Sequence, residues 1–221
     1  MKLLLTSGGV TNASIHAALV GMLGKPISEC RALCIPTAQH GHPWCTPDSA
    51  WRFVAGRSPA PMVDLGWASV GLLELLALPH RPRDRWEAWV RAADVLLVDG
   101  GDAAFLTHWL RQTGLADLLP DLTDTVWVGV SAGSMALTPR IGPQFLSWPG
   151  ANGDDWGLGL VDFSIFPHLN YPDFPDNRMA NAEAWAAQIG GPAYALDDQS
   201  AVRVVGGVAE VISEGEWRAF P

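Results

Sequence analysis

Short apolar runs alternate with amphipathic segments along the first 137 residues of the chain. Runs rich in leucine and β-branched residues predict buried strands over 2–6, 30–36, 62–65, 94–98 and 125–130. The segments between them predict helices over 12–23, 49–55, 86–93 and 103–112, and an apolar helix or loop near 70–78. Because strand and helix alternate, we expect parallel strands, right-handed crossovers and helices on both faces of the sheet.

The pattern changes after residue 138. Residues 139–170 are rich in Gly, Pro, Trp and Asp and predict loops, apart from a strand over 161–166. A helix over 178–189 follows, and then short strands over 193–196, 201–205, 208–212 and 217–220. Gly206-Gly207 predicts a hairpin. We therefore expect an α/β fold with a doubly wound, mostly parallel sheet and short C-terminal antiparallel strands, in one domain over residues 1–221.

Composition narrows the classes of function. With 48% hydrophobic and 17% charged residues, the chain can bury a sizeable core. The net charge of −9 leaves no basic patch, so we expect no nucleic-acid partner. The apolar run at the N-terminus stops at Thr6, too early for a signal peptide or a membrane anchor. Three cysteines, an odd number, favour a reducing compartment, and we expect a cytoplasmic protein without membrane association.

The sequence His40-x-His42-x-x-Cys45 contains three residues that can bind a metal. It lies in a Pro- and Gly-rich loop and lacks a fourth ligand at a recognisable spacing. We therefore expect no metal site there.

Gly129-x-Ser131-x-Gly133 stands where an apolar strand gives way to good helix formers. Glycines on both sides allow a tight turn that pushes a serine hydroxyl out of the sheet, as a nucleophile elbow requires. The same pattern is also typical of an ordinary strand-to-helix turn. A catalytic interpretation therefore needs a base, an orienting acid and an oxyanion hole elsewhere in the chain.

Candidates for these roles follow other predicted strands, and carboxyl ends of parallel strands meet at one edge of a sheet. Gly100-Gly101 follows a buried strand and could offer a backbone N–H beside that of Ala132. Pro167 ends a strand just before His168, a residue suited to general base catalysis. For the acid, the residues alone do not rank Asp197-Asp198 against Asp154-Asp155.

Several ordered motifs together resemble the serine peptidase family that includes peptidase E, an aspartyl dipeptidase, and cyanophycinase. They are Gly100-Gly101-Asp102 followed by Phe105-Leu106, Gly129-Val-Ser-Ala-Gly-Ser134, Gly157-Leu-Gly-Leu160 leading to Phe166-Pro-His168, and Leu196-Asp-Asp-Gln-Ser-Ala201. The resemblance implies a flavodoxin-like fold similar to class I glutamine amidotransferases. It also implies a serine peptidase of the dipeptidase type that acts on small peptides without a metal or organic cofactor, and we expect a monomer or a homodimer.

The resemblance also assigns roles. No acid lies in 142–147, shortly after the nucleophile, where peptidase E has one, whereas cyanophycinase-like members carry a glutamate at the place of Asp198. The implied site comprises a catalytic triad of Ser131, His168 and Asp198, oxyanion-hole amides of Gly101 and Ala132, and substrate contacts from Gly100, Asp102, Arg178 and Asp197. Arg178 would bind the carboxylate of an aspartyl substrate. The alternatives are a cyanophycinase-like exopeptidase acting on β-Asp-Arg, and a non-catalytic small-molecule-binding protein.

Overall fold

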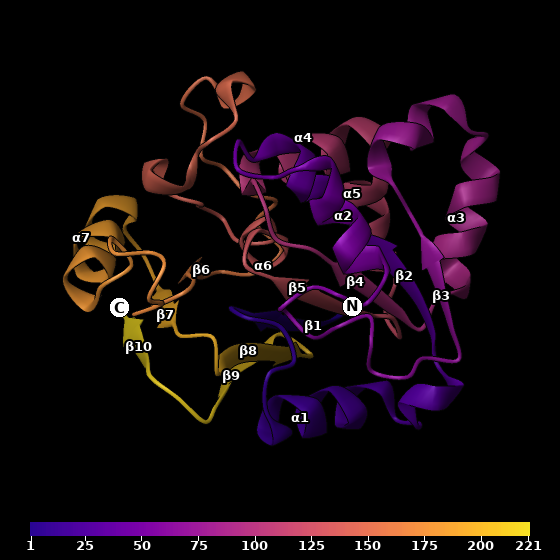
Figure 1. Ribbon diagram of the computed structural model, residues 1–221, viewed down its shortest axis with the longest axis horizontal. Helices are drawn as coiled ribbons and strands as arrows, with labels where there is room; N and C mark the ends of the chain where they lie inside the picture. The colour runs from indigo at the N-terminus through magenta and orange to yellow at the C-terminus, as the bar shows by residue number, and fades with distance from the viewer.

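The computed structural model describes residues 1–221, apart from the side chain of Pro47. Its main sheet has seven strands in the order β3-β2-β4-β5-β1-β8-β9 (Figure 1). The strands are β1 (Lys2–Thr6), β2 (Arg31–Ile35), β3 (Ser69–Leu72), β4 (Val95–Val98), β5 (Val126–Val130), β8 (Ser200–Val205) and β9 (Val208–Ser213). The first five are parallel to one another, whereas β8 runs antiparallel to both β1 and β9.

Helices connect the parallel strands. They are α1 (Ala13–Leu23), α2 (Pro47–Val54), α3 (Arg83–Ala92), α4 (Ala103–Thr113), α5 (Leu115–Leu118), α6 (Ala132–Met135) and α7 (Met179–Ile189). Short 3-10 helices add η1 (Ile27–Glu29), η2 (Thr37–Gly41), η3 (Leu75–His80), η4 (Leu119–Asp121), η5 (Pro143–Phe145) and η6 (Pro149–Ala151). In the part of the chain that the structure describes, no helix is both long and apolar enough to cross a membrane.

Alternating side chains of the central strands pack on opposite faces of the sheet, as the pleat requires. In β1, Leu3 and Leu5 join the core with residues of α3, α4 and α5, whereas Leu4 joins a second core with residues of α1. Figure 1 shows α1 on one side of the sheet and α4 and α5 on the other. The predicted doubly wound arrangement is therefore confirmed.

A second sheet lies beside the main one. Its three strands, in the order β10-β7-β6, are β6 (Ser164–Phe166), β7 (Ala193–Leu196) and β10 (Trp217–Phe220). Figure 1 shows it at the left with α7, and Trp185 of α7 packs with Phe166 and Ala193 in a third apolar cluster. The predicted β8–β9 hairpin is confirmed. The sequence pattern did not reveal that the C-terminal strands divide between two sheets.

The predicted strand over 62–65 is wrong. Met62 lies in a loop and is fully buried, and its carbonyl accepts the indole N–H of Trp67 at 2.8 Å. The strand at this edge is β3, which pairs with β2 within the segment that we expected to be helix or loop. A loop with buried apolar side chains and a short strand give the same apolar pattern in the sequence, so this pattern alone does not distinguish a loop from a strand.

Candidate active site

Ser131 lies in a sharp turn between β5 and α6. Its φ of 50° and ψ of −111° are unusual for a residue with a side chain. Its N–H donates to the Thr6 carbonyl at 3.1 Å, which ties the turn to the end of β1. A Cβ at Gly129 would lie 2.4 Å from the Gly133 carbonyl oxygen, so the turn can close only over a glycine at 129. This local geometry is that of a nucleophile elbow.

His168 and Asp198 form a hydrogen-bonded pair. His168 follows β6 with a φ of 57°, and its Nδ1 lies 2.7 Å from Oδ1 of Asp198, in the turn after β7. The side chains are 20% and 25% exposed, respectively. Burial opposes the charge of Asp198, but hydrogen bonds from His168 and Ser7 and the charge of His168 outweigh it and lower the pKa of Asp198. Asp198 is thus a carboxylate that can orient the imidazole.

Ser7 joins this pair, and the sequence analysis did not identify it. Its hydroxyl donates to Asp198 Oδ1 at 2.8 Å and accepts the backbone N–H of His168 at 2.7 Å. Ser7 follows β1, which pairs with both β5 and β8. Its place at the carboxyl end of a central strand was the available signal, because that edge carries the site.

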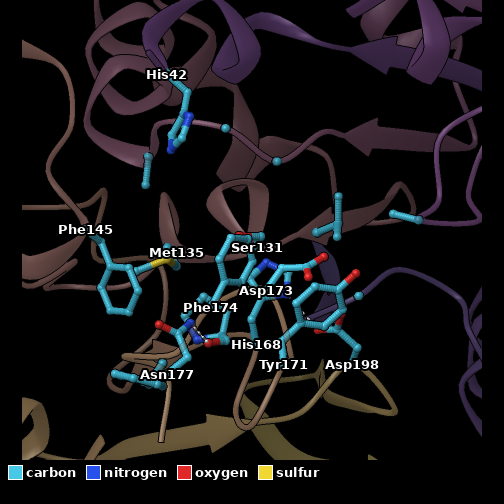
Figure 2. Close-up of a pocket in the computed structure, with 18 of the residues that line it drawn as sticks. His42, Ser131, Met135, Phe145, His168, Tyr171, Asp173, Phe174, Asn177 and Asp198 are labelled. Atoms are coloured by element: carbon cyan, nitrogen blue, oxygen red, sulfur yellow. Dashed lines mark hydrogen bonds and ion pairs between the residues drawn. The ribbon is translucent and has the colours of Figure 1, made fainter. Parts of the chain in front are cut away.

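The three side chains Ser131, His168 and Asp198 line one pocket of about 1280 Å³ (Figure 2). Figure 2 shows them grouped on one side of the pocket, with His42 on the opposite side. Among the described residues, the hydroxyl of Ser131 makes no hydrogen bond to His168. Catalytic hydrogen bonds are often long in the absence of substrate and tighten when it binds, so this geometry is compatible with a nucleophile and its base.

Two backbone amides beside Ser131 are available to a ligand. The N–H of Gly101 and that of Ala132, the first residue of α6, have no hydrogen-bond partner within the part of the chain that the structure describes. Gly101 has a φ of 133°, and a Cβ there would lie 2.3 Å from the carbonyl oxygen of Ala38. The N–H of Gly100 is already bound to Oδ1 of Asp99 at 2.8 Å. Gly101 and Ala132 are therefore the better pair of donors.

Asp99, at the end of β4, is a further residue of the pocket that the sequence analysis missed. It is 2% exposed, and besides Gly100 it accepts a hydrogen bond from Nε2 of Gln39 at 2.7 Å. Burial raises its pKa to about 7, because two neutral donors compensate only partly for the lost water. Gln39 also accepts the thiol proton of Cys45 at 2.7 Å, which extends the polar network across the pocket.

Asp102, which we expected to contact substrate, has a structural role. It is fully buried at the N-cap of α4, where one carboxylate oxygen accepts the N–H of Phe105 at 2.7 Å. The other oxygen accepts the N–H groups of Ser147 and Trp148 at 2.9 and 2.8 Å. Both oxygens are thus occupied by backbone donors, and Asp102 is not among the residues that line the pocket.

Asp197 and Arg178 also lie outside the pocket lining. Asp197 closes the turn between β7 and β8, where it accepts hydrogen bonds from the Gln199 N–H at 3.0 Å and the Ser200 hydroxyl at 2.6 Å. Its other oxygen accepts the Glu216 N–H at 2.5 Å. Arg178 is the exposed N-cap residue of α7. The structure therefore does not bring these two residues to the nucleophile.

The other candidate acids, Asp154 and Asp155, lie in the loop between η6 and β6, outside the pocket. Asp155 is bound by Arg140 in a bidentate ion pair, with both nitrogen–oxygen distances at 2.9 Å, and accepts the Gly142 N–H. Asp154 accepts the N–H of Trp156 at 3.1 Å. Neither residue lines the pocket of Ser131.

The residues of the His-x-His-x-x-Cys pattern point to different partners. His40 contacts Glu74 at 3.2 Å, His42 accepts the backbone N–H two residues on, and Cys45 donates to Gln39. Over the described part of the chain, no group of three or more His, Cys, Asp and Glu side chains could hold a metal ion.

Comparisons with known proteins identify a family and a fold. The sequence model that describes peptidase family S51 matches residues 3–212 of this chain. A crystal structure of a Listeria monocytogenes EGD-e protein named as a peptidase E is similar with a TM-score of 0.69 and 19% identity, over 97% of this chain and 98% of that one. A peptidase from an acI-B1 actinobacterium is similar with a TM-score of 0.68 and 21% identity, over 98% and 88%. No curated protein sequence matches the chain. At these identities the two structures establish the fold.

Proposed function

Since the chain belongs to peptidase family S51 and is a serine-type peptidase, we propose that it cleaves short peptides with a triad of Ser131, His168 and Asp198. The observation that carries this proposal is the 2.7 Å contact between His168 and Asp198, in the same pocket as a serine with nucleophile-elbow geometry. An acid that orients a histidine toward a nucleophile is the arrangement that activates serine.

In the proposed reaction, the hydroxyl oxygen of Ser131 attacks the peptide carbonyl carbon while His168 takes the hydroxyl proton. Asp198 holds the imidazole through Nδ1, which leaves Nε2 to take the hydroxyl proton, and the charge of Asp198 stabilises the imidazolium that forms. The N–H groups of Gly101 and Ala132 would donate to the developing oxyanion, and each such donor typically lowers the barrier by about 3–4 kcal/mol. His168 then protonates the leaving amine, and water releases the acyl group by the same steps in reverse.

The substrate class is a small peptide, and we propose a dipeptidase-type reaction. The expected preference for an N-terminal aspartate depended on Arg178, and the exposure of Arg178 outside the pocket removes its support. A cyanophycinase-like exopeptidase would use the same triad, so assays with Asp-x dipeptides and with β-Asp-Arg distinguish these two activities.

Labelling with a fluorophosphonate, followed by peptide mapping, tests the nucleophile. We expect one label on Ser131 in the folded protein, and at least a 1000-fold loss of peptide hydrolysis in Ser131→Ala, as typical for removal of a serine nucleophile. Ser134→Ala is the matched control, because Ser134 lies in α6 and its hydroxyl is bound to the Thr6 carbonyl. An unlabelled Ser131, or equal peptide turnover by wild type and Ser131→Ala, contradicts the mechanism. Absence of turnover by wild type favours a non-catalytic binding protein.

A further inference from the structure

The charged residues that line the catalytic pocket are acidic or histidine. Asp99, Asp173, Asp176 and Asp198 contribute to its wall, and the described residues of the lining include no lysine or arginine. Asp99 and Asp198 are engaged inside the site, as described above. A substrate carboxylate would therefore face acids without a counter-charge, which disfavours acidic substrates.

Asp173 and Asp176 differ from the other two acids. Both are exposed, and within the described part of the chain neither carboxylate forms an ion pair or accepts a hydrogen bond. They lie on the loop between His168 and α7, so their charges face the space that a bound peptide must enter. Unpartnered carboxylates at the wall of a substrate pocket are available to a cation from the substrate.

Aromatic side chains form a row along the same wall. The ring of Trp44 stacks on Phe174, with centroids 6.4 Å apart and planes 17° apart, and Phe174 lies 5.3 Å from Tyr171. Both Phe174 and Tyr171 contact the ring of His168, at 5.3 and 5.9 Å. We call Trp44, Phe174 and Tyr171 the aromatic row. The row begins at the exposed Trp44 and ends at the proposed general base, so a group bound along it would lie beside the reacting carbonyl. Figure 2 shows Tyr171 and Phe174 next to His168.

We propose that this wall binds a cationic group of the peptide substrate, with Asp173 and Asp176 as counter-charges and the aromatic row as its apolar and cation–π surface. An ammonium or guanidinium group satisfies both features, because it pairs with carboxylates and is attracted to ring faces. A purely apolar side chain would leave the two carboxylates unused, and an acidic one would meet repulsion. The proposal rests on the proposed function, since it assigns the substrate class of the same pocket.

The cation has two chemical sources, a lysine or arginine side chain and the free α-amino group of the peptide. Calorimetric titration of the Ser131→Ala protein separates them without turnover. Nα-acetyl-lysinamide carries only the side-chain cation, leucinamide carries only the α-ammonium, and Nα-acetyl-leucinamide carries neither. We expect at least one cationic amide to bind tenfold or more tightly than Nα-acetyl-leucinamide, with an affinity that falls as salt is raised.

In the same titration, the Asp173→Asn and Asp176→Asn double variant should lose that preference. Asp124→Asn is the matched control, because Asp124 is exposed at the amino end of β5, away from the pocket. Equal binding of the three amides, or an unchanged preference in the double variant, overturns the proposal. Cation binding without peptide turnover by wild type would refute only the proposed function. Hydrolysis that does not favour Lys-Leu over Gln-Leu or Glu-Leu, together with equal amide binding, would refute only the cation site.

Discussion

Two aspartates flank Ser131 at the carboxyl ends of the central strands, and their surroundings shift their pKa values in opposite directions. Asp99 ends β4 on one side, whereas Asp198 lies beyond β1 on the other, in contact with Ser7. Asp99 is 2% exposed, and burial raises its pKa to about 7. Asp198 is a quarter exposed, and the hydrogen bonds from His168 and Ser7 lower its pKa despite the cost of burial.

The difference lies in the donors and in the water that each carboxyl retains. Asp99 receives neutral amide N–H groups from Gln39 and Gly100, which stabilise its charge only weakly in a buried place. Asp198 faces an imidazole that becomes cationic during the reaction. The negative charge therefore stays on the side where a positive charge develops. Near neutral pH the carboxyl of Asp99 carries only part of its negative charge. This lowers the negative charge beside Gly100 and Gly101, where the oxyanion is expected to form.

The largest expected effect comes from removing the charge of Asp198. Asp198→Asn should lower kcat for peptide hydrolysis about 10⁴-fold, about 5 kcal/mol in the barrier, because the imidazole loses its orienting carboxylate. Steady-state kinetics at pH 7.5 measure the loss. Asp197→Asn is the adjacent control and should keep kcat within threefold, because Asp197 only closes the β7–β8 turn. If the Asp197 variant lost activity and the Asp198 variant kept it, the comparison of the two acids would be wrong.

Next in size is the effect of Asp99 on stability. Its folded pKa of about 7 exceeds the ordinary value of 3.8, so between these pH values the folded state binds a proton that the unfolded state does not. The free energy of unfolding should therefore fall as pH rises from about 4 to 7, by at most about 4 kcal/mol at about 1.4 kcal/mol per pKa unit. Asp99→Asn removes this dependence and should become more stable, relative to wild type, as pH rises.

Urea unfolding at pH 5, 6, 7 and 8 measures this change for wild type and Asp99→Asn. Asp124→Asn is the control, because an exposed carboxylate should give a curve parallel to that of wild type. Parallel curves for Asp99→Asn and wild type would show that the carboxyl of Asp99 is charged in the folded protein at pH 5. That result would remove the contrast with Asp198.

The sequence predicted most of the fold because its central strands are fully buried and therefore carry continuous apolar runs. It failed at the edge, where the buried Met62 of a loop gave the same apolar signal as a strand. It also did not predict the parallel pairing of β6 with β7, because 26 residues of loop and helix separate their ends and only tertiary packing brings them together.

Of the proposed site, the sequence indicates the members whose residue type and place at a strand end coincide, as for Ser131 and His168, which the structure places in one pocket. Local sequence does not indicate that Asp198 contacts His168 whereas Asp155 pairs with Arg140, because both contacts join residues far apart in the chain. One local signal was overlooked: Asp102 directly precedes an apolar helix, the position of an N-cap. Ser7 precedes Gly8-Gly9, where a serine is also typical of an ordinary turn. Its contacts with His168 and Asp198 depend on which strands pair with β1, and the sequence does not show that pairing.

The smallest expected effect concerns Ser7, whose hydroxyl connects Asp198 to the backbone of His168. His168 has a left-handed backbone conformation, which costs free energy unless surrounding contacts fix it. Ser7→Ala removes one donor to the carboxylate and the acceptor for the His168 N–H. We expect kcat to fall about tenfold, about 1.4 kcal/mol, with KM nearly unchanged, since Ser7 does not line the pocket.

A matched comparison with Ser134→Ala separates this positioning role from loss of stability. Both serines are fully buried and each donates one hydrogen bond, but Ser7 also accepts the His168 N–H. Ser134→Ala should therefore lose about 1 kcal/mol of unfolding free energy, and Ser7→Ala at least as much. Only Ser7→Ala should lose kcat, and because Asp198 then has one donor fewer, the acidic limb of the kcat profile should move to higher pH. Equal kinetic losses in the two variants, or an unchanged acidic limb in Ser7→Ala, would reduce Ser7 to a structural residue and leave His168 and Asp198 to hold their geometry without it.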